Sequence, residues 1–166
     1  MSHEKAPVTA AIRVLRQHKI PFTEHLYHYE ERGGTAVSSR ELGVEEHAVV
    51  KTLVMEDETR QPLLVLMHGD CEVSTKTLAR LVQVKTITPC APEVANRHSG
   101  YMVGGTSPLG TRKAMPVYME QSILNLPKMY VNGGKRGFLV GVDPKAIAKI
   151  LNAVLVEIAI PHHGES

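Results

Sequence analysis

Apolar and polar positions recur along the chain at spacings that predict a mixture of short helices and strands. Val8, Ala11, Ile12 and Leu15 follow the i, i+3, i+4, i+7 pattern of an amphipathic helix, which would carry Pro7 in its first turn and end before residue 21. Residues 49–55 (VVKTLVM) and 63–67 (LLVLM) are apolar runs of strand length. The charged stretch 56–61 between these runs predicts a β-hairpin.

Caps, turns and shorter apolar runs mark the other predicted elements. Further helices are expected at residues 35–42, 74–82, 92–97 and 144–151. Ser38 and Glu41 have capping-box spacing, Gly43 is a stop signal, and Ser74 and Asp143 are N-cap candidates. Further strands are expected at residues 22–29, 84–88, 115–119, 128–132, 138–142 and 155–158. The pattern lacks regular βαβ alternation, so it predicts one mixed α/β domain over residues 1–166, with a disordered tail from about residue 160.

Composition narrows the class of protein. The 166 residues are enough for one domain with a substantial core, and with 43% hydrophobic content and no Trp that core should be mainly aliphatic. The formal net charge of +2 is too small for polyanion binding through bulk charge, although a local basic patch remains compatible with it. Cys71 and Cys90 are too few for a disulfide framework. No secretory signal and no membrane-length apolar run is recognised, so a cytoplasmic location without membrane association is expected.

Residues 99–110 (SGYMVGGTSPLG) concentrate four glycines and a proline in twelve positions. Glycine permits positive φ and close backbone approach, so such a loop can present several N–H groups to a carbonyl or phosphate oxygen. A tight connection between two strands would explain the same composition. The loop matches neither the Walker A pattern nor the dinucleotide-binding fingerprint.

Cations accompany the glycine-rich segments. Lys51 lies inside an apolar strand, where an ammonium must reach solvent, find a partner or face a polar cavity. A solvent-facing position and a role in binding a carbonyl or phosphate oxygen both remain open for it. Lys135 and Arg136 occupy the tip of a second glycine-rich segment, residues 133–137, which is either a phosphate-contacting turn or an ordinary solvated hairpin.

Other candidate chemistry is weaker. His25 and His28 would point to opposite faces of a strand, and no completing ligands are evident, so no metal is expected. Ser107 lies outside a G-x-S-x-G elbow, and Cys71 and Cys90 are interpreted as packed thiols. The residues therefore indicate a site of backbone dipoles and cations rather than a side-chain nucleophile.

Three segments in order, residues 49–53 (VVKTL), 100–110 (GYMVGGTSPLG) and 130–137 (YVNGGKRG), strongly resemble the YbaK family of bacterial aminoacyl-tRNA deacylases, relatives of the prolyl-tRNA synthetase editing domain. The likeness extends from the first predicted helix to residue 151, and Gly104 and Pro108 supply its G-x-x-x-P element. The resemblance implies a compact α/β fold, a mixed and partly barrel-like sheet with flanking helices. It also implies hydrolysis, without metal or cofactor, of the ester joining a wrongly attached amino acid to tRNA. For YbaK itself this is cysteine on proline tRNA, so the implied partners are the acceptor end of tRNA(Pro) and, as a further candidate, prolyl-tRNA synthetase.

The resemblance also implies roles for individual residues. Lys51 would contact the aminoacyl-adenosine end, with Thr52 beside it, and Tyr27 would line the same pocket. The residues that would shape the amino-acid pocket and offer groups to the ester are Gly104, Gly105, Thr106, Ser107 and Pro108. Further substrate contacts are expected from Tyr101, Gly133, Gly134, Lys135 and Arg136.

An aminoacyl ester is already activated, so positioning and oxyanion stabilisation can supply much of the acceleration. Water helped by the neighbouring ribose hydroxyl could attack, or the thiol of a cysteine substrate could attack and release a cyclic thiolactone. One position departs from the family pattern, because Leu139 stands where an acidic residue is expected. Cysteine selectivity, selectivity for alanine or another small residue, cleavage of a different activated acyl compound, and a non-catalytic tRNA- or synthetase-binding role therefore stay open. The intact Lys51 and glycine loop favour catalysis.

Overall fold

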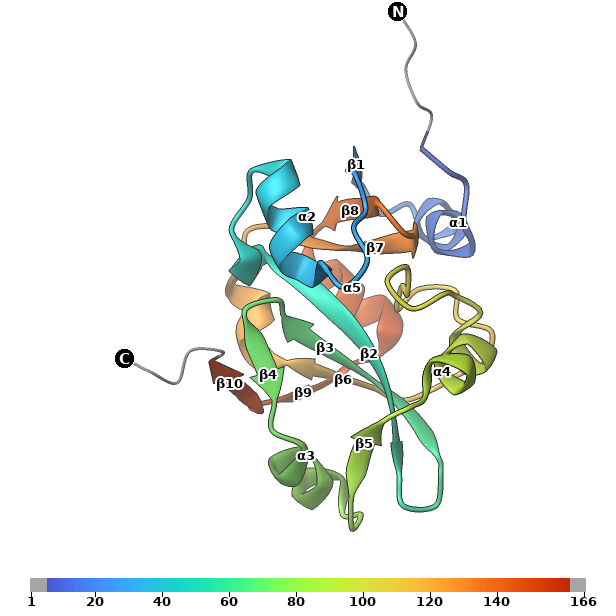
Figure 1. Ribbon diagram of the computed structural model, residues 1–166, viewed down its shortest axis with the longest axis vertical. Coiled ribbons are helices and arrows are strands. Elements are labelled where there is room, and N and C mark those ends of the chain that lie inside the picture. Colours follow the sequence, from blue (N-terminus) through green and yellow to red (C-terminus); the bar gives the residue numbers. More distant parts are fainter. Residues whose placement is uncertain (1–5, 162–166) are drawn as a thin grey trace, which may run out of the picture.

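The apolar runs of the sequence form one curved sheet in the computed structural model, which describes residues 6–161 (Figure 1). The tail expected to be disordered from about residue 160 is ordered at residues 160 and 161, which belong to a strand, and the rest of it lies outside the described residues. The strands are β1 (Thr23–Leu26), β2 (Val49–Asp57), β3 (Pro62–His68), β4 (Cys71–Val73), β5 (Ile87–Pro89), β6 (Val117–Glu120), β7 (Met129–Lys135), β8 (Phe138–Val142), β9 (Val154–Val156) and β10 (Ala159–Pro161). The helices are α1 (Ala10–Gln17), α2 (Gly34–Leu42), α3 (Thr75–Val82), α4 (Pro92–Ser99) and α5 (Pro144–Leu151), with short 3-10 helices η1 (Glu46–Ala48) and η2 (Gln121–Asn125).

The main sheet is mixed and has eight strands, in the order β1-β8-β7-β2-β3-β6-β9 with β5 added beside β2. Antiparallel pairs join β1 to β8, β7 to β8 and β2 to β3, whereas β2–β7, β3–β6 and β6–β9 are parallel. The central hairpin runs in register from Val50 opposite His68 to Glu56 opposite Pro62. The predicted mixed α/β architecture is confirmed, and the strand path starts at β1 and ends at β9 rather than closing into a full barrel.

Alternation along β2 divides its side chains between two hydrophobic cores. Val50 and Val54 belong to the larger core, which α1 and α5 complete with residues such as Leu15 and Ile147. Met55 belongs to the smaller core, on the side of the sheet that α3 covers. Both cores are mainly aliphatic, as the composition predicts.

Local capping sets the helix ends. Ser74 and Asp143 cap α3 and α5 as predicted. Helix α1 begins later than predicted because Thr9, not Pro7, organises its start: Thr9 Oγ1 accepts a hydrogen bond from the Ile12 N–H at 3.1 Å.

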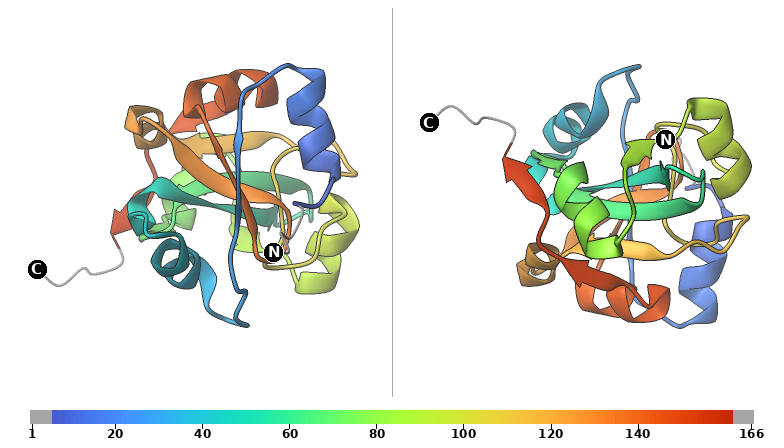
Figure 2. Two further views of the ribbon diagram at one scale, coloured as in Figure 1. Left: turned by 90° about the horizontal axis from the view of Figure 1, so that it is seen from above. Right: turned by 90° about the horizontal axis from the view of Figure 1, so that it is seen from below.

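Figure 2 shows α5 and α2 on opposite sides of the sheet. No helix among residues 6–161 combines the length and the apolar character that crossing a membrane requires.

The capping-box interpretation of Ser38 and Glu41 is wrong. Ser38 lies inside α2, and its hydroxyl donates to the Thr35 carbonyl at 3.2 Å, a local bond that competes with capping. The predicted stop is correct, since Gly43 ends the helix with φ of 68°.

The second glycine-rich segment is mostly strand rather than turn. β7 continues through Gly133 and Gly134 to Lys135, with a bulge against β8, so only residues 136 and 137 form the turn. The Asn132 side chain stabilises this bulge, because its Oδ1 accepts from the N–H groups of Gly134 at 2.6 Å and of Lys135 at 3.0 Å.

Two further predictions need correction. The glycine loop follows α4 and leads to β6, so it does not connect two strands. β4 and β10 were not predicted; they pair with each other in a separate two-stranded sheet.

The edge of β2 opposite β3 is interrupted. Val49 and Val50 pair with β7, and Met55 to Asp57 pair with β5. Residues 51–54 lie between these two pairings and pair with neither strand. At the end of this gap the Cys90 N–H donates to the Val54 carbonyl at 3.0 Å. This interruption leaves room for a site beside the middle of the central strand.

Candidate active site

A cavity of about 580 Å³ opens beside the interrupted edge of β2. Its other walls come from the segment before α2, from α2 itself, from the glycine loop, from the ends of β7 and β8, and from the β5–α4 connection. Its volume falls in the range of about 300–1,000 Å³ that is usual for small-ligand sites. The lining residues include Tyr27, Tyr29, Arg32, Thr35, Val50, Lys51, Thr52, Val54, Cys90, Gly104, Thr106, Asn132, Arg136 and Leu139.

Thr52 lines this cavity and carries an unpaired polar atom. Its Oγ1 is buried and has no hydrogen-bond partner among the described residues. Leaving a buried hydroxyl unpaired costs about 1–3 kcal/mol. A polar atom of a ligand would remove that cost, so Thr52 is suited to substrate contact.

Lys51 lies between the cavity and a group of acidic side chains. Burial is the main influence on its ammonium and lowers the pKa of Lys51 below the ordinary value, while Glu72, Cys71, Glu46 and Asp70 act in the opposite direction. The side chain is half-buried, and the residue lines the cavity. A partly desolvated ammonium interacts more strongly with an anionic or carbonyl oxygen than one in bulk water.

Side-chain donors hold the glycine loop against β7. The Gly104 carbonyl accepts from Asn132 Nδ2 at 3.1 Å, and the Val103 carbonyl accepts from Arg136 Nε at 2.9 Å. Because the N–H and C=O of a trans peptide point in opposite directions, the N–H of Gly104 points away from Arg136. Gly104 has φ of 91°, and a Cβ there would lie 2.6 Å from the Tyr29 hydroxyl oxygen, so no larger residue fits this conformation.

Two tyrosines in the segment before α2 form another wall. The Tyr27 N–H donates to the Gly137 carbonyl at 2.9 Å, which fixes this segment to the β7–β8 turn. The Arg136 guanidinium lies over the Tyr29 ring, 5.0 Å from its centroid. Burial is the largest influence on the Tyr27 phenol and raises its pKa, so the group stays protonated near neutral pH.

Several predicted site residues are buried within the glycine loop and do not line the cavity. Tyr101 and Ser107 are buried and both contact Leu109: the Tyr101 hydroxyl donates to its carbonyl at 2.6 Å, and Ser107 Oγ accepts from its N–H at 3.2 Å. Burial raises the pKa of Tyr101 to about 12. Pro108 is buried beside them. The structure therefore brings these residues to the base of the loop.

Gly105, Gly133, Gly134 and Lys135 also do not line the cavity. A Cβ at Gly105 would lie 2.8 Å from the backbone nitrogen of Arg136, so glycine here permits the close approach of loop and strand. Gly133, Gly134 and Lys135 belong to the β7 bulge, outside the lining. Of the second glycine-rich segment, Arg136 is the residue that the structure places in the cavity wall.

Cys90 is a cavity-lining thiol with weak nucleophilic character. Its Sγ donates to Glu56 Oε1 at 3.5 Å, and burial together with this carboxylate raises the pKa of Cys90 to about 12. Since the thiolate is the reactive form, this environment suppresses attack by Cys90. The arrangement agrees with a site that works through cations and backbone groups.

Sequence reasoning missed Asn132 and Tyr29, and it did not place Cys90 in the site. Asn132 directly precedes the Gly133–Gly134 pair, and an Asn before glycines is a signal for side-chain bonding to the local backbone. Tyr29 follows Tyr27 at the two-residue spacing that puts extended residues on one side. Both signals were available, whereas the approach of Cys90 depends on the tertiary fold.

His25 and His28 do not line this cavity, and the His25 ring is hydrogen-bonded through Nε2 to Thr23 Oγ1 at 2.7 Å. Within residues 6–161, potential metal ligands gather elsewhere, at His47, Asp70 and Cys71.

The fold and the cavity define a class of protein with a curved mixed sheet and a ligand site where the central strand meets a glycine loop. Residues 31–150 match the family described as the aminoacyl-tRNA editing domain, and the chain belongs to this family. It is 31% identical over 151 residues to EbsC of Enterococcus faecalis, a protein named as a Cys-tRNA(Pro)/Cys-tRNA(Cys) deacylase; the match covers 90% of this chain and 92% of EbsC.

Solved structures agree on the fold. One, titled as a trans-editing enzyme for prolyl-tRNA synthetase, is 21% identical, with a TM-score of 0.79 over 93% of this chain and 99% of the other. Another, the hypothetical protein APE2540, is 20% identical, with a TM-score of 0.84 over 92% of this chain and 100% of the other. The family resemblance and the fold predicted from the sequence are thereby confirmed.

Proposed function

We propose that this chain is a trans-editing deacylase, which cleaves the ester between a small amino acid and the 3′ end of tRNA, with Cys-tRNA(Pro) as its first substrate. The observation that carries the proposal is the cavity of about 580 Å³ in which Lys51 and the Gly104 loop meet, in a chain of the aminoacyl-tRNA editing family. The name of EbsC supports cysteine and tRNA(Pro) as the substrate to test first. The acceptor end of tRNA is then the partner, prolyl-tRNA synthetase a candidate second partner, and the cytoplasm, where tRNA is charged, the proposed location.

The proposed chemistry is assisted by the substrate. Lys51 holds an oxygen of the terminal adenosine or the ester, Thr52 supplies its unpaired hydroxyl, and backbone N–H groups of the loop stabilise the developing oxyanion. For cysteine, the substrate sulfur bonds to its own carbonyl carbon while the bond to the ribose oxygen breaks. The thiol proton passes to that oxygen, which releases tRNA and a thiolactone. For other amino acids a water attacks instead, oriented by the neighbouring ribose hydroxyl.

Gly105, Ser107, Pro108 and Tyr101 act in this proposal through the shape of the loop rather than by touching substrate. Thr106, which lines the cavity, remains a candidate for direct contact, and its hydroxyl donates to the Met102 carbonyl at 3.4 Å. The bulge residues Gly133, Gly134 and Lys135 position Asn132 and Arg136.

Leu139 shapes selectivity. It is 3% exposed and lines the cavity at the place where the family resemblance predicts an acidic residue. Among the described lining residues the carboxylates are Glu30 and Glu31, and Glu30 already pairs with Arg40 at 3.0 Å. The substrate amine is therefore expected to pair with a carboxylate in the segment before α2 rather than with one on β8.

The test is deacylation of Cys-tRNA(Pro), Ala-tRNA(Pro) and Pro-tRNA(Pro) under single-turnover conditions, with and without prolyl-tRNA synthetase. Rapid loss of Cys-tRNA(Pro), with Pro-tRNA(Pro) spared, is the expected result. Preferential loss of Ala-tRNA(Pro) would support a deacylase function but show that alanine, not cysteine, is the amino acid removed. Stability of all three, with and without the synthetase, would contradict a deacylase function.

Asn132→Asp is expected to lower kcat/KM for Cys-tRNA(Pro) by ~10-fold or more, because the change keeps an acceptor for the bulge but removes the donor to the Gly104 carbonyl. Thermal unfolding should change little, since the bonds from Gly134 and Lys135 remain available. The measurement is single-turnover deacylation beside a melting curve. Asn125→Asp, in η2 outside the cavity, is the matched control and should behave as wild type. Equal activity of the two variants would contradict a positioning role for Asn132.

A further inference from the structure

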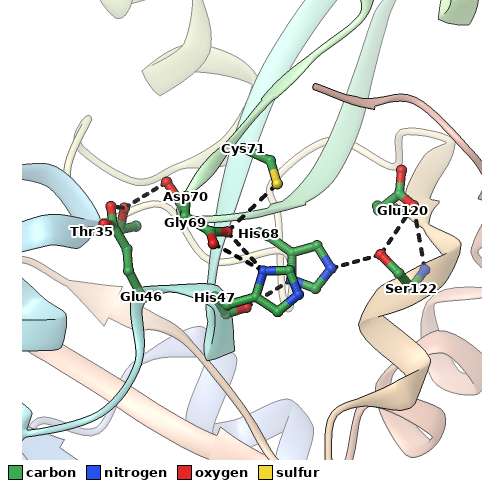
Figure 3. Close-up of polar contacts among 9 residues, drawn as sticks. All are labelled: Thr35, Glu46, His47, His68, Gly69, Asp70, Cys71, Glu120 and Ser122. Carbon is green, nitrogen blue, oxygen red and sulfur yellow. Dashed lines mark hydrogen bonds and ion pairs between the residues drawn. The ribbon is translucent and has the colours of Figure 1, made fainter. Parts of the chain in front are cut away.

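We propose that His47, Asp70 and Cys71 form a binding site for a zinc-like divalent cation, separate from the deacylase cavity. His47 lies in η1, Asp70 in the turn between β3 and β4, and Cys71 at the start of β4 (Figure 3). None of the three lines the cavity, so this proposal stands independently of the proposed function.

The ligand atoms lie at distances that a small cation can bridge. His47 Nδ1, a carboxylate oxygen of Asp70 and Cys71 Sγ all lie within 4.8 Å of one another. Asp70 Oδ1 is 2.9 Å from His47 Nδ1 and 3.6 Å from Cys71 Sγ. Tetrahedral zinc, with bonds of about 2.0–2.3 Å, holds neighbouring ligand atoms about 3.3–3.6 Å apart. The 3.6 Å separation already fits, so a small outward movement of the Asp70 carboxylate away from His47 is enough to admit the ion.

The imidazole of His47 rests on a buried network. Its ring stacks on the ring of His68, with centroids 3.7 Å apart and an interplanar angle of 7°. His68 is 0% exposed and is fixed at both nitrogens, by the His47 carbonyl at 2.7 Å and by Ser122 Oγ at 2.8 Å. Ser122 is anchored in turn to Glu120, at 3.1 Å (Figure 3). The stack on this fixed ring limits the orientations of the His47 imidazole.

Nearby carboxylates favour a cation, and the ligand type favours zinc over magnesium or calcium. Three carboxylates, those of Glu72, Glu46 and Asp70, act electrostatically on the Lys51 ammonium, so acidic groups outnumber this cation near the proposed site. One imidazole, one carboxylate and one thiol make a nitrogen, oxygen and sulfur set, which suits zinc, whereas magnesium and calcium take oxygen ligands. Binding displaces the thiol proton of Cys71 to solvent and replaces the His47–Asp70 hydrogen bond. A water completes the fourth position.

The test uses Co²⁺ as a spectroscopic probe, titrated into the full chain without an affinity tag, followed by displacement with Zn²⁺. The expected result is a near-ultraviolet thiolate-to-cobalt band with intense visible bands of tetrahedral coordination, both abolished by Zn²⁺. Cys71→Ser should lose the near-ultraviolet band. His47→Gln and Asp70→Asn should bind Co²⁺ ~10-fold or more weakly. Since the side chains of His47 and Asp70 are 45% and 41% exposed, neither change should disturb folding.

Two controls keep the result specific. Cys90→Ser removes the other thiol and should leave the spectrum unchanged. Pro161 pairs with Cys71, and two histidines follow Pro161 in sequence. A His162→Ala/His163→Ala variant tests whether these histidines supply a metal ligand, and it should also leave the spectrum unchanged. Absence of the thiolate band in wild type, its persistence in Cys71→Ser, or its loss in Cys90→Ser would overturn the proposal. Far-ultraviolet circular dichroism of each variant confirms that the fold is retained.

Discussion

Replacing Lys51 with alanine should lower single-turnover deacylation of Cys-tRNA(Pro) by ~100-fold or more, the largest effect expected of any single side chain in the cavity. The physical reason is the environment of the ammonium. It is half-buried on the central strand and lines the cavity, and burial lowers its pKa. An interaction made there with a developing negative charge is weakened less by solvent than one at an exposed site. Loss of one such preorganised donor typically costs about 10²–10³-fold in rate.

The matched control, which separates the loss of a cation in the cavity from the loss of any one positive charge, is Lys76→Ala. Lys76 is exposed on α3 and does not line the cavity, so its replacement makes the same change in net charge. It should deacylate as wild type, apart from a small change in the salt dependence of tRNA binding. Lys51→Arg keeps the charge with a different shape, and it should recover only part of the activity if position matters as well as charge. Wild-type rates for Lys51→Ala at saturating enzyme would remove Lys51 from the catalytic machinery.

Local signals were sufficient for much of the fold. The β2–β3 hairpin and α5 lie where apolar runs, a charged turn and the Asp143–Pro144 cap predict them. The glycine loop and Lys51 could be singled out because glycine clusters and a cation inside an apolar strand are unusual in any fold. These predictions needed only neighbours in sequence.

Features that depend on distant partners were not predictable in the same way. β4 and β10 are three residues long, too short for a periodic pattern, and each exists because the other pairs with it. Cys90 belongs to the cavity because β2 takes β7 as its partner at one end and β5 at the other. The capping error at Ser38 has a local cause, since a serine inside a helix can bond backward to the preceding turn. In the same way, His47 and Asp70 meet only through the tertiary fold, which is why the sequence predicted no metal ligands there.

Gly104→Ala should abolish most of the activity while leaving the protein folded, with deacylation reduced by ~100-fold. With φ of 91°, residue 104 lies where an L side chain is strained, at a cost of about 1–3 kcal/mol. In addition, the new Cβ would lie 2.6 Å from the Tyr29 hydroxyl oxygen, so the loop or the tyrosine must move. Movement of the loop disturbs the bond from Asn132 to the Gly104 carbonyl and displaces the loop N–H groups from the ester. Movement of Tyr29 instead alters the cavity wall and its contact with Arg136.

Gly43→Ala separates backbone strain from this steric effect. Gly43 has φ of 68° with nothing within 4 Å of a built Cβ, so alanine there costs about 1–2 kcal/mol of stability but leaves the cavity intact. The double variant Gly104→Ala/Tyr29→Phe removes the Tyr29 hydroxyl oxygen, the atom nearest to the new Cβ. The nearest ring atoms then lie 3.1 Å from that Cβ. The loss of activity that Gly104→Ala causes should therefore be smaller in the Tyr29→Phe background than in the wild-type background. Equal losses for Gly104→Ala and Gly43→Ala would mean that strain alone lowers activity and that the approach of the loop to Tyr29 has no catalytic importance.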